Sequence, residues 1–85
     1  MTWQEIRRAV PHRWILVEAL KAHSESAMRV VEDLSIIGEF HDSVSAMREY
    51  QARHRADPAR ELYVVHTDRE ELDIHERVYV GPRYR

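Results

Sequence analysis

Cysteine is absent from this chain of 85 residues, and glycine occurs only twice. Without cysteine no disulfide can form, which fits a reducing compartment such as the cytoplasm. Two glycines are too few for a phosphate-cradling loop, and together with the short length they exclude a dinucleotide-binding fold. No apolar run approaches the ~20 residues of a membrane-spanning helix, and residues 1–5 lack the features of a signal peptide. We therefore expect residues 1–85 to form a single soluble, cytoplasmic domain without a membrane segment.

Lysine is nearly absent as well, and the chain has no excess of positive charge. Lys21 is the only lysine beside twelve arginines, and the formal net charge is -2. Because the arginine fork suits phosphate, a nucleic-acid-binding protein is one alternative. Its candidate contacts are Arg7–Arg8, Arg13–Trp14 and Arg83–Tyr84–Arg85. Such proteins usually carry a net positive charge or a basic face, so we expect no nucleic-acid partner.

The first twenty residues predict a helix and a strand. Thr2 and Glu5 have the spacing of a capping box, and apolar side chains follow at helical spacing, so we predict a short amphipathic helix over residues 3–9. A strand follows over residues 14–20, and both of its faces are apolar and need cover. One face carries Trp14, Leu16 and Leu20, and the other carries Ile15, Val17 and Ala19.

The next segment predicts a hairpin. Residues 29–40 contain two pairs of adjacent β-branched residues, which favour a strand. The polar segment 22–28 is then the turn, but it has no Asn-Gly or Asp-Gly pair that would define the turn type. Gly38 marks a bulge or a bend near the end of the strand. A helix over residues 18–33 is the main alternative.

A helix between two strands occupies the centre of the chain. Asp42 is a good N-cap for an amphipathic helix over residues 42–56, which Asp57–Pro58 ends. Residues 62–66 then form a short apolar strand. This order predicts a crossover connection that returns the chain to the same sheet.

The last part of the chain predicts a helical turn and a final strand. Thr67 and Glu70 repeat the capping-box spacing, which predicts a single helical turn over residues 67–72. Alternating apolar and polar residues predict a strand over residues 73–80.

Together these elements predict an α+β fold, that is, an α/β two-layer arrangement. It contains a mostly antiparallel sheet of about four strands, the main helix 42–56 packed on it, and the short N-terminal helix. One main helix can cover only one face of such a sheet, so apolar surface left over would mark an interface. The two edges of the sheet offer strand addition as a further means of association.

Six histidines are a high share for a chain of this length. Local zinc sites use pairs of histidine or cysteine a few residues apart, whereas the closest pair here, His66 and His75, is nine residues apart. We therefore expect no metal site. The histidines are His12, His23, His41, His54, His66 and His75.

Three polar residues lie inside predicted strands among apolar neighbours: Glu18, Glu32 and His66. If their side chains met on one face of the sheet, burial would shift their pKa values into a useful range for acid-base chemistry. Such a cluster would be the site of an enzyme or of a small-ligand- or metal-binding protein. Alternatively, each side chain points to solvent or pairs with a nearby arginine or lysine, since strand parity alone cannot bring the three together.

No serine has the Gly-x-Ser-x-Gly context that exposes a nucleophile. We assign no catalytic residue, no cofactor-binding residue and no cofactor.

Four segments of the chain carry a resemblance: Pro11–Leu20, Ala46–Tyr50, Arg60–Thr67 and Arg69–Leu72. They are spread over most of the chain and resemble segments of small bacterial proteins that share a short domain of unknown function. The resemblance implies no activity, so it transfers no catalytic residue.

The function we expect is that of a small, non-enzymatic interaction or regulatory module that forms a homodimer or a higher homo-oligomer. This expectation rests on strands with two apolar faces in a chain too short to cover them. The Glu18, Glu32 and His66 cluster and the arginines remain the basis of the two alternative functions.

Overall fold

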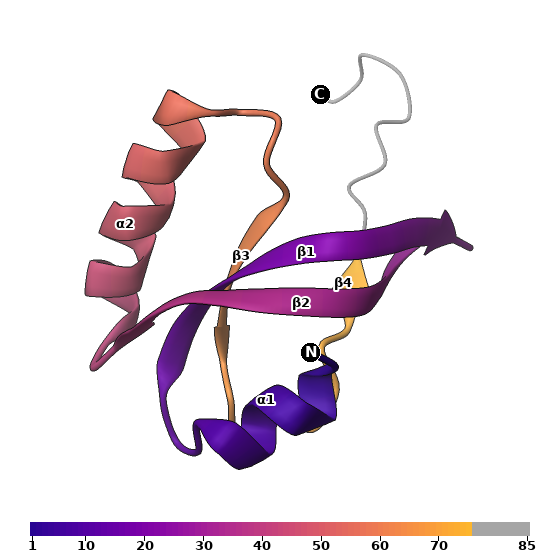
Figure 1. Ribbon diagram of the computed structural model, residues 1–85, viewed down its shortest axis with the longest axis horizontal. Helices are drawn as coiled ribbons and strands as arrows, with labels where there is room; N and C mark the ends of the chain where they lie inside the picture. The colour runs from indigo at the N-terminus through magenta and orange to yellow at the C-terminus, as the bar shows by residue number, and fades with distance from the viewer. Residues whose placement is uncertain (76–85) are drawn as a thin grey trace, which may run out of the picture.

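The fold combines one antiparallel sheet with two helices, and a computed structural model describes residues 1–75 (Figure 1). Three long strands form the sheet, and a fourth strand of two residues extends it, so that the order is β3-β1-β2-β4. All neighbouring strands are antiparallel. The α+β class is confirmed. The elements are α1 (Trp3–Ala9), β1 (Trp14–Glu25), β2 (Met28–Phe40), α2 (Ser43–Ala56), β3 (Leu62–His66) and β4 (Ile74–His75).

The strands β2 and β3 are joined by the predicted crossover. Both are antiparallel to β1, which lies between them, so β2 and β3 run parallel to each other. The helix α2 connects them, beginning after Asp42, whose carboxylate caps it, and contacting all three long strands. Neither α2 nor α1 is long and apolar enough to cross a bilayer.

The hairpin of β1 and β2 is longer than the sequence predicts. Glu25 pairs with Met28 across a turn of two residues, Ser26 and Ala27, whose φ angles are 50° and 63°. Two successive positive φ angles define a type I′ turn, which matches the twist of the flanking strands. The strand β1 therefore continues past its predicted end at Leu20, and the alternative of a helix over this region is wrong.

A bulge interrupts the pairing of β1 and β2 beside Gly38, as the sequence predicts. Leu16 pairs with Gly38 but Val17 pairs with Ile36, so Ile37 is the extra residue. A Cβ atom on Gly38 would lie 3.1 Å from Cζ of Phe40. The missing side chain thus leaves room for the Phe40 ring.

The two helices lie on different sides of the sheet (Figure 1). Trp3 and Ile6 of α1 join a core cluster with Ile15 and Val17 of β1. Side chains of the opposite parity face α2, where Ala46 is fully buried.

Both faces of β1 are covered near its start. Ile15, Leu16 and Val17 are all 0% exposed, although their side chains alternate between the faces. The two helices supply the cover at this part of β1, so no apolar strand face is left over there for a second copy. Leu20, further along the strand, is 57% exposed.

The segment after β3 is a turn and not the predicted helical turn. The Thr67 hydroxyl does not cap a helix, because it accepts a hydrogen bond of 3.0 Å from the backbone N–H of Arg13. Two side chains of α1 donate hydrogen bonds to backbone carbonyl groups of this segment. Trp3 Nε1 donates to the Arg69 carbonyl at 3.1 Å, and Arg7 Nε donates to the Thr67 carbonyl at 3.0 Å.

The predicted final strand is only partly described. Ile74 and His75 pair with Arg29 and Met28 as β4. The remainder of the prediction, residues 76–80, lies outside the described residues.

Candidate functional site

Glu18, the first residue of the predicted polar cluster, forms a two-pronged ion pair with Arg60. Arg60 Nη2 lies 2.7 Å from Oε1 of Glu18, and Arg60 Nε lies 3.1 Å from Oε2. Both side chains are partly buried on the side of the sheet that faces α2. Hydrogen bonds from Arg60 lower the pKa of Glu18, so this carboxylate stays charged. The ion pair connects β1 to the loop before β3.

Glu32 and His66 have other partners. Glu32 contacts Lys21 and His23 on the hairpin, at 3.4 and 3.3 Å. The His66 ring packs edge-on against Trp14, with 5.1 Å between ring centroids, and its Nδ1 accepts a hydrogen bond from the backbone N–H of Asp68.

The structure does not bring these three residues together. Glu18 faces Leu62 and His66 faces Trp14, at opposite ends of the β1–β3 ladder. A separation of four residues along a strand corresponds to about 13 Å. Within residues 1–75, no contact joins two members of the predicted cluster, so it forms no acid-base site.

A second ion pair, which sequence reasoning missed, joins the tip of the hairpin to the start of β3. Arg29 binds both carboxylate oxygens of Glu61, at 2.8 and 2.9 Å, and the Tyr63 hydroxyl donates to the same carboxylate. A hydrogen bond from Arg29, and to a smaller extent one from Tyr63, lowers the pKa of Glu61. Burial, and to a smaller extent the contact with Glu61, raises the pKa of Tyr63. Because Arg29 and Glu61 are 32 positions apart, no local pattern signals this contact.

The histidines are dispersed. His12 contacts Asp68, His23 contacts Glu25 and Glu32, and His54 stacks on Tyr50. No group of three or more possible ligands that could hold a metal ion occurs among the residues that the structure describes.

Two of the arginine candidates for nucleic acid, Arg7 and Arg13, lie beside Thr67. Arg7 is engaged with the Thr67 carbonyl and with Gln4, and Arg13 is exposed in the loop before β1. The tract Arg83–Tyr84–Arg85 lies outside the described residues.

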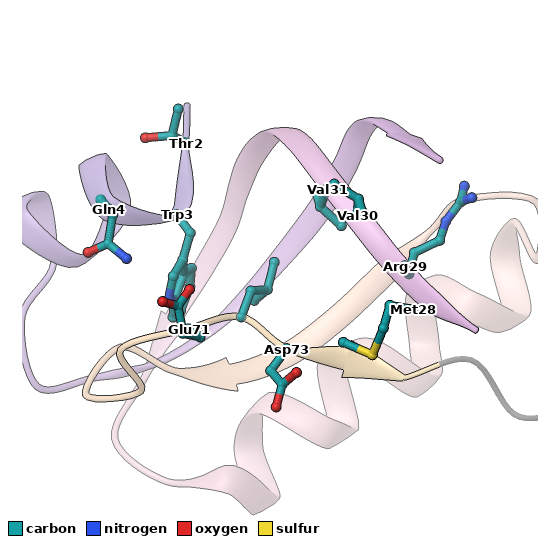
Figure 2. Close-up of a pocket in the computed structure, with 10 residues that line it drawn as sticks. Thr2, Trp3, Gln4, Met28, Arg29, Val30, Val31, Glu71 and Asp73 are labelled. Atoms are coloured by element: carbon teal, nitrogen blue, oxygen red, sulfur yellow. The ribbon is translucent and has the colours of Figure 1, made fainter. Parts of the chain in front are cut away.

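One surface cavity lies between the start of α1, the start of β2 and residues 71–73 (Figure 2). Its volume is about 500 Å³, and Trp3, Val30, Val31 and Leu72 supply its apolar lining. The Trp3 indole N–H already donates to the Arg69 carbonyl. Three charged residues, Arg29, Glu71 and Asp73, also line this cavity.

The outer edge of β2, next to this cavity, is partly covered. Leu34 N–H donates to the Met1 carbonyl at 2.7 Å, and the Met1 amine donates to the Leu34 carbonyl and to Asp33. Further along the same edge, β4 pairs with β2. A new strand could therefore not pair along the length of this edge.

The outer edge of β3 is open. Ala19 N–H donates to the Glu61 carbonyl, and Thr67 N–H donates to the Arg13 carbonyl. Since residues of an antiparallel strand alternate in direction, every second residue from 61 to 67 bonds β1. The residues between them direct their backbone N–H and C=O groups away from β1, and no described strand lies on that side. These outward residues are Leu62, Val64 and His66.

A groove of about 300 Å³ follows this open edge. It is lined by Met47 and Tyr50 of α2 and by Leu62, Tyr63 and Val64 of β3. Met47 is 41% exposed and Val44, one turn earlier on α2, is 59% exposed. The open edge is thus bordered by accessible apolar side chains.

No family model, no curated protein and no solved structure matches this chain.

Proposed function

We propose that this chain is a small, non-enzymatic interaction module that self-associates through the outer edge of β3. The observation that carries the proposal is the row of outward backbone groups at Leu62, Val64 and His66, which pair with no described strand and lie beside an apolar groove. Unpaired strand edges bind other strands readily, so natural proteins either protect them or use them.

The composition of β3 supports this use. Edge strands are commonly protected by proline, by lysine or by other charged side chains. The sequence Leu-Tyr-Val-Val-His contains none of these, and five residues is an ordinary strand length. The opposite edge of the sheet is partly covered by Met1 and β4, whereas no described strand lies beside β3.

The surface of α2 supports it as well. Val44 and Met47 expose apolar side chains on the helix that borders the groove. An added strand would lie next to these side chains and remove part of their surface from water, which favours association. The absence of cysteine supports the cytoplasmic location that we propose for the module.

The proposal is tested by placing a charge on the open edge. Val64→Lys puts an ammonium group at the centre of β3, where lysine opposes pairing of edges. We expect the unchanged chain to sediment as a dimer or a higher oligomer and Val64→Lys to sediment at the monomer mass of 10.2 kDa. Sedimentation velocity over a range of concentrations measures both.

Leu20→Lys is the matched control, because Leu20 is an exposed apolar residue of β1, four residues along that strand from Leu16, which pairs with Val64. This variant should keep the oligomeric state of the unchanged chain. Circular dichroism confirms that both variants are folded. An unchanged chain that remains monomeric, or a Val64→Lys variant that remains oligomeric, would overturn the proposal.

A further inference from the structure

We infer that β3 pairs with the β3 strand of a second copy, antiparallel, with Val64 facing Val64 across a two-fold axis. This inference rests on the proposed function and specifies its partner, direction and register. Its basis is the backbone geometry of the open edge and the two-fold symmetry of a dimer in which both copies use the same edge.

The register follows from which backbone groups are unpaired. A two-fold axis at Val64 pairs Leu62 of each copy with His66 of the other, so all three outward residues find outward partners. The His66 carbonyl accepts one bond from Arg69 N–H and has a second lone pair available.

Other positions of the axis satisfy fewer groups. A shift along the strand would pair an outward residue with Arg60 or with Asp68. The backbone N–H of Arg60 already donates to the Asp57 carbonyl, and that of Asp68 donates to Nδ1 of His66. The register with Val64 facing Val64 therefore pairs more of the outward backbone groups of β3 than a shifted register does.

The direction follows from the backbone and from symmetry. Two copies that use the same edge are related by a two-fold axis, and with antiparallel strands each outward residue then faces an outward residue of the other copy. In a parallel pair each outward residue bonds the two residues on either side of its neighbour, so the strands are offset by one residue and no two-fold axis relates them.

Single-cysteine variants test the register, because the chain has no cysteine of its own. Facing residues in a hydrogen-bonded antiparallel pair have Cα atoms about 5.5 Å apart. This distance lies within the roughly 4.4–6.8 Å that a disulfide allows. We expect Val64→Cys to form a covalent dimer on mild oxidation, measured by non-reducing electrophoresis.

Leu62→Cys and His66→Cys provide the internal comparison. In this register each thiol is about 13 Å from its counterpart in the second copy, so neither variant should cross-link alone. An equal mixture of the two should form the mixed dimer. Leu20→Cys, on β1, reports collisional cross-linking.

The outcomes separate the inference from the proposed function. Cross-linking of Leu62→Cys and His66→Cys alone, as strongly as Val64→Cys, would indicate parallel pairing and overturn the inference. A chain that sediments as a dimer without cross-linking above the Leu20→Cys level at any β3 position would also overturn it, while the proposed self-association would stand. A chain that sediments only as a monomer would overturn both.

Discussion

At the residue scale, the hairpin turn places two residues that have side chains in a left-handed backbone conformation, which is energetically unfavourable. Ser26 and Ala27 both have positive φ, which disfavours residues with a side chain by about 1–2 kcal/mol each. Asparagine and glycine are the preferred residues for this turn. Because the chain has no such pair here, the sequence does not define the turn type. For the same reason the predicted strand ends at Leu20, whereas β1 continues to Glu25.

We expect the double variant Ser26→Asn, Ala27→Gly to raise the free energy of unfolding by about 1 kcal/mol. Chemical denaturation monitored by circular dichroism measures this change. The control Ala22→Gly lies within β1, where glycine weakens a strand, and should lower stability. A double variant less stable than the unchanged chain would contradict the account of the turn.

A second prediction at this scale concerns the pH dependence of the Arg29–Glu61 pair. The pKa of Glu61 lies below its ordinary value of 4.5 because Arg29 stabilises the charged form. A carboxyl group with a lowered folded pKa contributes stability above its unfolded pKa and loses it as pH falls toward the folded value.

We therefore expect Glu61→Gln to lower the free energy of unfolding by about 1 kcal/mol at pH 7. The difference from the unchanged chain should shrink as the pH falls below 4.5. Thermal unfolding at a series of pH values tests this, with Glu39→Gln, an exposed β2 variant, as the comparison. A difference that stays constant over this range would show that the pair contributes nothing through charge.

At the element scale, helix termini were predictable because their signals are local. The capping box of Thr2 and Glu5 forms, and Asp42 caps α2 as predicted. The same spacing at Thr67 and Glu70 failed, because the Thr67 hydroxyl binds the Arg13 N–H, 54 positions away in the sequence. The ion pairs of Glu18 and Glu61 were unpredictable for the same reason.

The α2 cap gives a direct prediction. Asp42 Oδ1 accepts a hydrogen bond of 2.7 Å from the Ser45 N–H, which would otherwise lack a partner in the first turn. Asp42→Ala should lower the free energy of unfolding by about 1 kcal/mol, whereas Asp42→Asn should retain most of the stability. Denaturant titration of the two variants measures the difference, and equal losses would show that the side-chain acceptor is unimportant.

At the scale of the whole molecule, the candidate surface for self-association is an edge of the sheet and not one of its faces. Sequence patterns showed that both faces of β1 are apolar, and the two helices cover them within one chain. Which strand lies at an edge depends on strand order, and strand order depends on long-range pairing that no local pattern encodes. The β3 edge therefore became a candidate only once the sheet order β3-β1-β2-β4 was known.

Amide hydrogen exchange at Val64, measured by NMR over a range of protein concentrations, tests the central claim most directly. The Val64 N–H points away from β1 and bonds no other residue of the described range 1–75, so we expect a partner strand to protect it. We predict that its exchange slows as concentration rises, together with that of Leu62. The N–H of Val65, which bonds β1, should be protected throughout. Fast exchange of the Val64 amide at every concentration would contradict the claim that β3 is an association edge.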